Sequence, residues 1–429
     1  MHSILVIIPV FRGYSETRAC IESVLAANCR TAHEVLAVDD ASPEPALSEW
    51  LAELARVGRL QLQRNPSNLG FVCSVNRAMQ SRPEADVVLL NSDTCVTDGW
   101  LDRLADCAAR NPDAASVCPF SNNATLASYP RSGQSNVLPP EFDLQRLSAL
   151  FARCNAGVAI DVPTTVGFCM YLRRGALEDV GLFDEQAFGT GYGEENDWCL
   201  RAAGKGYRHL IAADGFVFHK GEVSFAAEAA AAKARAEKIM AERHPGYAEQ
   251  IAAYFAQDPA REARRAVDLA RLAVSEVPNL LFITHHWGGG TEQHILDLAG
   301  ICQGAANVLV MRPHSSHAVS VSWCTGHDVR EEFHAFFEND DREELLRFLR
   351  GIQVARVHLH HVHGHAPEVL ELARDLGAAL DVTLHDYWPL TPQYHLDHGG
   401  VVPEREIDHP WGWSLAHWRS RMQGVLASA

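Results

Sequence analysis

The residues whose types and spacing best suit chemistry are acidic side chains that follow short apolar segments. Asp39 and Asp40 follow one such segment, and Asp93 follows another, two residues after Asn91. Carboxylates gathered at the ends of buried strands repel one another unless a cation or a ligand N–H compensates their charge. Carboxylate oxygens are also the ligands that hard divalent cations such as Mg²⁺ or Mn²⁺ prefer. This pattern therefore indicates a ligand or cation site, with Asp93 as its first candidate.

A second acidic group lies further along the chain, where Glu194, Glu195 and Asp197 open a segment with helical periodicity. Glu195 shares helical spacing with Trp198 and the apolar residues after it, so it can lie near the start of a helix whose apolar side packs inward. Acidic side chains at a helix N-terminus also complement the helix dipole. At least one of these three acids is therefore expected to serve only the helix.

The elements that must position these residues alternate between strands and helices up to Phe120. Short apolar strands separated by amphipathic helices predict a doubly wound, mostly parallel α/β sheet. In such sheets ligands bind at the carboxyl ends of the strands, which is where the acidic residues of both segments fall. We expect strands at residues 4–10, 34–38, 60–63 and 86–90, and helices at 15–28, 46–57 and 74–80.

Shifts in composition divide the chain into three parts. Residues 164–225 continue the first domain with a strand and helix pattern whose last apolar strand precedes His219. From Ala226 the sequence is rich in Ala, Glu, Lys and Arg, which predicts helices. A new α/β pattern starts at Pro278. We therefore expect a first domain over residues 1–225, a helical connector over 226–277 and a second, Rossmann-like α/β domain over 278–429.

The overall composition narrows the classes of function. The net charge of −17 argues against non-specific nucleic-acid binding and against a polybasic membrane anchor. No stretch approaches the roughly 20 apolar residues of a membrane span, and the N-terminus fits a buried strand better than a signal peptide. The eleven cysteines are scattered, without a Cys-x-x-Cys pair, as is typical of reduced thiols. We therefore expect a cytoplasmic protein.

The first domain resembles the inverting family-two glycosyltransferases, which have the GT-A fold. Nine segments in the family's order carry this resemblance and together span nearly all of residues 4–225. Their order is a stronger signal than any one segment. The segments are VIIPVF, CIESVL, VLAVDDASP, RNPSNLGFVCSVNRAM, VVLLNSDTCVTDGWLDRL, VGFCMYLRR, VGLFDE, GYGEENDWCLRAAGKGY and FVFHKGEVS.

The resemblance implies a divalent metal, Mn²⁺ or Mg²⁺, that neutralises a diphosphate leaving group. Asp93 lies in the family's Asp-x-Asp metal motif, and Asn91 replaces the first acid of that motif. We expect Asn91 to contact the ribose or a water. His219 stands where relatives have a histidine that contacts the metal or the diphosphate, although a histidine after an apolar strand is more often structural. We predict Asp93 and His219 as metal ligands.

The same resemblance places a nucleotide-sugar donor along the ends of the first strands. Asp39 and Asp40 match the family's acidic pair, which contacts the base and the ribose. A base that left such a buried carboxylate unpaired would bind poorly. A local turn with Ser42 is the alternative for one of the two acids. The remaining donor contacts that we predict are Pro9, Phe11, Asn68, Gly70 and Asn76, together with Asn91 and Asp93.

The acceptor hydroxyl needs a base, and the resemblance assigns that role to Glu195. It matches the second acid of the family's Glu-Asp motif, where Asp is usual, so its longer side chain shifts the base relative to the acceptor. Glu194 and Asp197 are rival candidates. On the acceptor side, where an aromatic face could stack on a sugar ring, the resemblance implies Gly167, Phe168 and Trp198.

The second domain resembles the N-terminal half of a family-four glycosyltransferase with the GT-B fold. The run 358–365 in it contains five histidines but lacks the Cys or acidic ligands of a diagnostic zinc spacing. The glycines at 288–290 could cradle a phosphate at a helix N-terminus, or face the substrate cleft as in these relatives. The segments that carry this resemblance are HHWGGGTEQHILDLA, ARVHLHHVHGH and VTLHDYWPLTPQ.

Together these features predict an inverting glycosyltransferase that moves a hexosyl-type or deoxyhexosyl-type sugar from a nucleotide-diphosphate sugar to a saccharide or lipid-linked acceptor. We expect it to build a surface polysaccharide of the O-antigen or capsule type, in the cytoplasm or at the inner face of the membrane. Two alternatives stay open. The 278–429 domain could be a non-catalytic module that binds the acceptor or a partner. The first domain could be a nucleotidyltransferase, although residues 10–13 lack the Gly-rich basic signature of that class.

Overall fold

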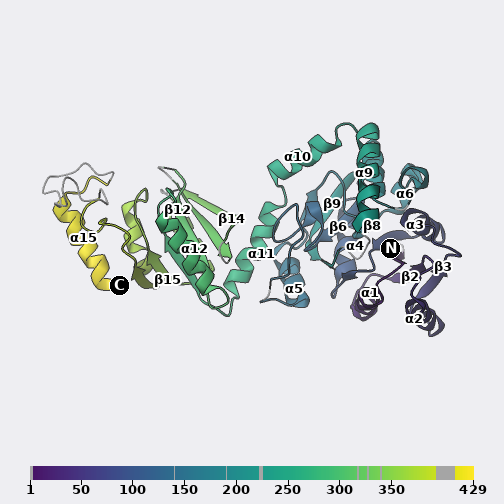
Figure 1. The fold of residues 1–429 in the computed structure, drawn as a ribbon, viewed down its shortest axis with the longest axis horizontal. Coiled ribbons are helices and arrows are strands. Elements are labelled where there is room, and N and C mark those ends of the chain that lie inside the picture. Colours follow the sequence, from purple (N-terminus) through teal and green to yellow (C-terminus); the bar gives the residue numbers. More distant parts are fainter. Residues whose placement is uncertain are drawn as a thin grey trace. The chain divides into compact units, whose positions relative to one another are not determined.

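The computed structural model describes residues 3–139, 141–189, 191–221, 226–315, 318–325, 328–338, 341–392 and 411–429. Its internal contacts divide the chain into two compact units, Met1–Val267 and Asp268–Ala429. Figure 1 shows the chain as a ribbon that is purple at the N-terminus and yellow at the C-terminus. Each unit has its own sheet and its own hydrophobic core.

An eight-stranded sheet forms the centre of the first unit. In spatial order its strands are β3 (Gln61–Arg64), β2 (His33–Asp39), β1 (Ile4–Val10), β4 (Asp86–Leu90), β8 (Cys169–Leu172), β6 (Ala114–Phe120), β9 (Arg208–Phe216) and β7 (Ala159–Asp161). The first four are parallel, β8 is antiparallel to both of its neighbours, β6 and β9 are parallel, and β7 is antiparallel to β9. The predicted mostly parallel α/β sheet is confirmed.

Helices pack on this sheet because each buries one apolar face. On α1 (Tyr14–Ala26), for example, Cys20, Ile21 and Val24 recur at helical spacing and are buried. The helices predicted at 15–28, 46–57 and 74–80 correspond to the first three helices of the structure. The further elements are α2 (Pro45–Arg56), α3 (Phe71–Gln80), α4 (Trp100–Arg110), η1 (Thr125–Ala127), α5 (Leu144–Cys154), α6 (Arg174–Val180), α7 (Glu185–Phe188) and α8 (Glu194–Ala203).

Three more helices follow, α9 (Ala226–Arg243), α10 (Tyr247–Gln257) and α11 (Arg261–Ala273). Met240 of α9 is buried in the core cluster that also contains Trp198. Tyr254 of α10 donates a hydrogen bond to the carbonyl of Leu126 at 3.1 Å. We predicted a separate connector over 226–277, whereas α9, α10 and the start of α11 pack within the first unit, which ends at Val267.

The second unit contains a six-stranded sheet. In spatial order its strands are β14 (Asp328–Glu338), β13 (Ala318–Thr325), β12 (Asn307–Pro313), β11 (Asn279–Ile283), β15 (Val354–Leu359) and β16 (Ala379–Val382). The last four are parallel, and β13 and β14 extend the sheet as an antiparallel hairpin. The helical elements of this unit are α12 (Gly290–Cys302), α13 (Arg342–Gly351), η2 (Pro367–Glu371), α14 (Leu372–Leu376) and α15 (Leu415–Ser428).

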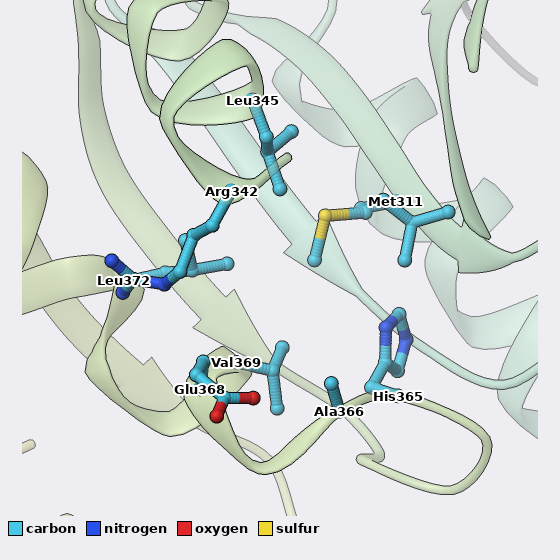
Figure 2. A pocket seen from close by; sticks show the side chains of 9 residues that line it. Met311, Arg342, Leu345, His365, Ala366, Glu368, Val369 and Leu372 are labelled. Atoms are coloured by element: carbon cyan, nitrogen blue, oxygen red, sulfur yellow. The ribbon is translucent and has the colours of Figure 1, made fainter. Parts of the chain in front are cut away.

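Figure 2 shows a pocket of the second unit, where Arg342 and Leu345 of α13 lie across from Met311 of β12 and from His365. Its volume is about 40 Å³, which holds a few water molecules. Such a space is too small for a nucleotide sugar.

Two predictions about the whole chain concern its cysteines and its relation to membranes. All eleven cysteines lie within the described residues and are free thiols. Among the residues that the structure describes, no helix is both long enough and apolar enough to cross a membrane.

Candidate active site

Asp93 lies in the turn that follows β4, at the carboxyl end of a central strand. The amide of Asn91 donates to the carbonyl of Phe168 at 2.8 Å, and the hydroxyl of Thr94 donates to the carbonyl of Asn91 at 2.7 Å. These bonds fix the backbone on both sides of Asp93. The side chain of Asn91 is half-buried.

A two-stranded antiparallel ribbon brings His219 to Asp93. Strand β5 (Thr94–Cys95) pairs with β10 (Phe218–His219), and Thr94 lies opposite His219. Nε2 of His219 lies 3.4 Å from Oδ2 of Asp93. The structure thus brings together the two residues that the sequence suggested as metal ligands.

The ring of His219 is held in one orientation. Its Nδ1 lies 2.7 Å from the carbonyl oxygen of Asn123. A carbonyl only accepts hydrogen bonds, so Nδ1 carries the hydrogen. Phe168 stacks on the same ring, with 5.2 Å between the ring centroids. In the neutral imidazole, Nε2 therefore presents a lone pair to Asp93, as metal-binding histidines do when their other nitrogen donates to a carbonyl.

A positive charge is needed between these two electron-rich atoms. Burial lowers the pKa of His219, but the hydrogen bond and charge of Asp93 outweigh it and raise this pKa above 6.5. Burial raises the pKa of Asp93, and His219 and a backbone amide lower it below 3.8 overall. A divalent ion with bonds of about 2.1 Å holds neighbouring ligand atoms about 3.0–3.4 Å apart. The residues present fit such an ion.

Residues around His219 that sequence reasoning missed complete this arrangement. The amide of Gly221 donates to Oδ2 of Asp93 at 3.0 Å, with φ at 69°. A Cβ at Gly221 would lie 2.0 Å from Nδ2 of Asn123, so only glycine fits. The side chain of Asn122 bonds both the amide and the carbonyl of His219 at 2.9 Å. The glycine two residues after the histidine was the available signal, because glycine permits close backbone approach.

Asp39 lies at the carboxyl end of β2 and is fully buried. It accepts hydrogen bonds from the amide of Ser42 at 2.8 Å, the hydroxyl of Ser48 at 2.7 Å and Nε of Arg64 at 2.9 Å. The local turn bond to Ser42, which the sequence offered as an alternative, is therefore present. This acid organises the start of α2 and the end of β3.

Asp40 is also buried and holds the loop before α3. It accepts hydrogen bonds from Nδ2 of Asn65 at 2.8 Å and from the amides of Leu69 and Gly70 at 2.8 and 2.9 Å. A carboxylate offers about four acceptor positions. Three positions are used in each case, but Asp39 is fully buried, whereas Asp40 keeps a small exposed fraction of 6%.

Pro9 and Phe11 border the same strand ends. The carbonyl of Val10 between them accepts a hydrogen bond from the amide of Asp40 at 2.9 Å. Both side chains are partly exposed, and the guanidinium of Arg12 lies 5.2 Å from the centroid of the Phe11 ring. They are therefore close to the acids with which the sequence grouped them.

Asn68 and Asn76, predicted as further donor contacts, have different surroundings. Asn68 is exposed, and its Oδ1 accepts a hydrogen bond from the amide of Gly70 at 3.0 Å. Asn76 is buried, and its Nδ2 donates to the carbonyl of Phe183 and to Glu185, both at 2.9 Å. Asn76 therefore clamps α3 to α7, while Asn68 remains accessible to a ligand.

Glu194 and Glu195 begin α8, and each has a carboxyl oxygen without a hydrogen-bond partner among the described residues. In each case this oxygen is Oε2, which is buried. Burial and the charge of Glu195 hold the pKa of Glu194 well above its ordinary 4.5. Burial also raises the pKa of Glu195, while backbone amides and a hydrogen bond from Glu194 act in the opposite direction. The pKa of each carboxyl is therefore raised, chiefly by burial.

Asp197 lies in the same helical turn but is engaged by basic side chains. Its carboxylate oxygens lie 2.8 Å from Nε of Arg201, 3.0 Å from Nε2 of His244 and 3.4 Å from Nη1 of Arg243. Burial raises the pKa of Asp197, but the bonds from His244 and Arg201 outweigh it and lower this pKa below 3.8. Asp197 ties α8 to the end of α9, which is a structural task.

Trp198 does not have the surroundings of an acceptor contact. Its side chain is fully buried, and the indole N–H donates to the carbonyl of Gly181 at 2.8 Å. Phe183 and His209 pack edge-on against it. The helical spacing that turns Trp198 inward places it in the core, so it presents no face on which a sugar could stack.

Gly167 and Phe168 connect the acid pair to Asp93 and His219. A Cβ at Gly167 would lie 3.5 Å from Cγ of Glu195. The next residue, Phe168, stacks on His219. Two consecutive residues therefore lie next to both halves of the candidate site, Gly167 next to Glu195 and Phe168 next to His219.

Solved glycosyltransferase structures resemble the chain at low sequence identity. A structure of GalNAc-T7 with UDP, GalNAc and Mn²⁺ is 17% identical with a TM-score of 0.40, and the match covers 51% of this chain and 44% of that one. S. aureus TarS is 13% identical with a TM-score of 0.36, and the match covers 64% of this chain and 40% of that one. The mannosyltransferase PcManGT from Pyrobaculum calidifontis, in complex with GDP-Man and Mn²⁺, is 16% identical with a TM-score of 0.41, and the match covers 64% of this chain and 76% of that one. The matches span less than half the length of the first two proteins.

A search of curated proteins found no match to the chain. One protein family model, however, matches part of it. Residues 5–181 match the family model described as glycosyl transferase family 2. This segment runs from β1 to the end of α6 and includes Asp93 and its neighbours. The N-terminal region of the chain therefore contains a glycosyltransferase family 2 domain.

Proposed function

We propose that the first unit is a metal-dependent, inverting glycosyltransferase that takes a hexosyl-type or deoxyhexosyl-type sugar from a nucleotide-diphosphate sugar. The observation that carries this proposal is the 3.4 Å approach of Oδ2 of Asp93 to Nε2 of His219 at the end of a central strand. The matching glycosyltransferase family 2 segment contains that strand.

Asp93 and His219 are the residues that would hold the metal, and Asn91, two residues before Asp93, offers an amide oxygen. A bound Mn²⁺ or Mg²⁺ supplies neutralisation of the charge that develops on the departing diphosphate. Because Asn91 replaces an acid, fewer carboxylates face the ion than in the family's Asp-x-Asp motif. We therefore expect the donor phosphates to strengthen metal binding.

The donor nucleotide would lie along the ends of β1 and β2. Asp40, which keeps a small exposed fraction, would accept from an N–H of the base or a ribose hydroxyl, and Asp39 would support it by holding the start of α2 and the end of β3. Pro9 and Phe11 border the same edge, and exposed Asn68 lies on the loop that Asp40 holds. Asn76 holds α3 against α7 and would affect donor binding only indirectly, by fixing the helix that follows this loop.

Glu195 is the base in this proposal. Its carboxylate takes the proton of the acceptor hydroxyl while the acceptor oxygen bonds to the anomeric carbon. The bond from that carbon to the diphosphate oxygen breaks on the opposite face, so the configuration inverts. A pKa raised by burial suits a carboxyl that accepts a proton during the reaction. Gly167 and Phe168 would border the acceptor, since they lie next to Glu195 and His219.

The acceptor that we propose is a saccharide or lipid-linked saccharide in the assembly of a surface polysaccharide, at the cytoplasmic face of the membrane. The pairing of a family 2 domain with a second α/β unit in one chain supports this part of the proposal. The second unit would then position the acceptor or a partner, or would itself belong to a GT-B transferase.

A donor screen with the full-length chain tests the proposal. Purified protein is incubated with a panel of nucleotide sugars and Mn²⁺, and release of nucleoside diphosphate is measured with and without EDTA. We expect release with one donor, its loss in EDTA and its loss in Asp93→Ala. Asp106→Ala is the matched control, because it removes an exposed carboxylate on α4 that pairs with Arg30.

Two results would overturn the proposal. Full transfer by Asp93→Ala in the presence of EDTA would exclude a metal at this site. Release of pyrophosphate from a nucleoside triphosphate and a sugar phosphate, in place of nucleoside diphosphate, would identify a nucleotidyltransferase instead.

A further inference from the structure

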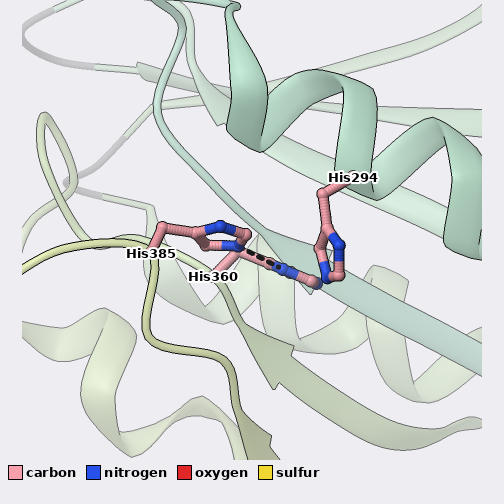
Figure 3. Close-up of side chains that lie close together, drawn as sticks. All are labelled: His294, His360 and His385. Carbon is pink, nitrogen blue, oxygen red and sulfur yellow. Dashed lines mark hydrogen bonds between the residues drawn. The ribbon is translucent and has the colours of Figure 1, made fainter.

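Three histidines from separate elements of the second unit come together beyond the carboxyl ends of its strands. His294 projects from α12, His360 follows β15, and His385 lies in the segment after β16 (Figure 3). One ring nitrogen from each lies within 4.8 Å of the other two. This group, called here the histidine cluster, lies apart from Asp93 in the sequence and belongs to the other unit.

The spacing within the histidine cluster fits coordination to one ion. Nδ1 of His360 lies 3.2 Å from Nε2 of His385. A tetrahedral zinc ion with Zn–N bonds of about 2.0–2.1 Å holds two nitrogens about 3.3–3.4 Å apart. Figure 3 shows the ring of His294 directed at the other two from its helix. Two of the ligands therefore already have the separation that an ion imposes.

Burial sets His360 apart from an ordinary surface histidine. Its side chain is fully buried, and its Nε2 has no hydrogen-bond partner among the described residues. Buried polar atoms normally have partners. The fold therefore holds this imidazole in the interior with only its Nδ1 engaged, within the described part of the chain, by His385.

The other histidines of the run 358–365 are engaged elsewhere. Nε2 of His358 lies 2.8 Å from the hydroxyl of Thr383. Nε2 of His365 lies 2.8 Å from the carbonyl of Thr284. His360 thus joins two histidines from outside the run, and spacing along the strand could not reveal the cluster.

We propose that the second unit binds a zinc-type transition metal ion through His294, His360 and His385, with a fourth position open to water or an anionic ligand. Imidazole ligands suit zinc, copper, cobalt and nickel, whereas Mg²⁺ and Ca²⁺ prefer oxygen. Among the residues that the structure describes, the group holds three ligands. Three protein ligands with an open position are the pattern of zinc sites that exchange a ligand, while structural sites have four protein ligands.

Metal retention by the untagged full-length chain tests the proposal. Protein stripped with EDTA is dialysed against Zn²⁺ with excess Mg²⁺, which competes at oxygen-rich sites, and bound zinc is measured by elemental mass spectrometry. We expect the wild type to retain one zinc ion more per chain than His294→Ala or His385→Ala. Loss of a ligand should weaken affinity by about 100-fold or more, since even indirect partners are worth 10–100-fold.

The choice of variants keeps the test independent of folding. His294 and His385 are half-buried, so their replacement perturbs the core less than replacement of buried His360. His417→Ala is the matched control, because this histidine is exposed on α15. Equal zinc retention by the wild type, His294→Ala and His385→Ala would overturn the proposal.

Cobalt substitution tests the geometry. Co²⁺ in the wild type should give the strong visible absorption of a tetrahedral ion, and His385→Ala should lose it. Added azide should change this spectrum if the fourth position is open. A spectrum of octahedral cobalt would contradict the three-histidine site, and a tetrahedral spectrum that azide leaves unchanged would contradict the open position.

Discussion

In the first unit a carboxylate and one imidazole meet after β4, whereas in the second unit three imidazoles meet beyond β15 and β16. Both groups lie at the carboxyl ends of parallel strands, the edge at which open α/β sheets bind ligands. The donor atoms differ, however. Oxygen-containing sets suit Mn²⁺ or Mg²⁺, and all-imidazole sets suit zinc-type ions.

Sheet topology determines where the side chains of a site gather, and the types of those side chains determine which ion they suit. Parallel strands place side chains from distant segments at one edge, whatever their chemistry. The identity of the side chains then selects the ion. Asp93 has its histidine supplied by an antiparallel ribbon, while His360 has its partners supplied by a helix and a loop. The same kind of sheet edge can therefore serve two unrelated chemistries.

The largest expected effect belongs to Asp93→Ala, which also tests whether the two centres are independent. Asp93→Ala should lower kcat for sugar transfer by about 10³-fold or more, because the ion that offsets diphosphate charge loses its carboxylate. Zinc retained by the histidine cluster should stay unchanged. Diphosphate release and metal content are measured on one sample, with Asp106→Ala as the control. A joint loss of transfer and zinc in a folded protein would contradict two independent centres.

A second variant separates the base from the metal ligands of the first unit. Glu195→Gln should lower kcat by about 10²–10⁴-fold, the usual contribution of a general base. The KM for the donor and the Mn²⁺ requirement should change little. Steady-state kinetics with varied donor check this, and Glu178→Gln, an exposed acid on α6, is the control. Unchanged kcat would remove Glu195 from the mechanism.

A third variant tests whether Asp197 has a structural role or a catalytic one. Asp197→Asn should cost about 3 kcal/mol of unfolding free energy, because it breaks a buried ion network with Arg201, Arg243 and His244. Denaturant unfolding measures the loss. At a temperature where the variant is folded, kcat should stay close to that of the wild type. A stable variant without activity would instead point to Asp197 as the base.

The smallest effect is a change in pH dependence. In the native state Glu194 has a pKa raised by burial and by the charge of Glu195, so above 4.5 the folded protein holds a proton that the unfolded chain has lost. The contribution of Glu194 to stability is therefore fully present below pH 4.5 and decreases by up to about 1.4 kcal/mol per pH unit as the pH rises toward its raised pKa. Glu194→Gln should reduce the slope of unfolding free energy against pH above pH 4.5, measured by denaturant unfolding. An unchanged slope would show that Glu194 ionises normally.

Local patterns predicted the sheet and the position of Asp93. Apolar runs and helical spacing are properties of neighbouring residues, so β1 and β4 begin and end where the sequence placed them, at 4–10 and 86–90. The same local reasoning turned Trp198 toward the core, and its full burial agrees with that spacing better than with the acceptor role implied by family resemblance.

Contacts between distant segments could not be predicted. The ring of His219 is oriented by Asn122 and Asn123, about a hundred positions away along the chain. The histidine cluster has the same origin, because His294 and His385 lie outside the run that contains His360. Such partners are fixed by how strands and loops stack in three dimensions, which no spacing along the chain encodes.

The ion network of Asp197 also has a consequence for domain exchange, because it sets how long a transferable segment must be. The family-matched segment ends at residue 181, and the motifs end near residue 225. Arg243 and His244, which contact Asp197, lie beyond both points. A recombination at either point would separate the carboxylate from two of its basic partners. A module that keeps Asp197 with its partners must therefore extend at least through His244, and the compact first unit, which ends at Val267, does so.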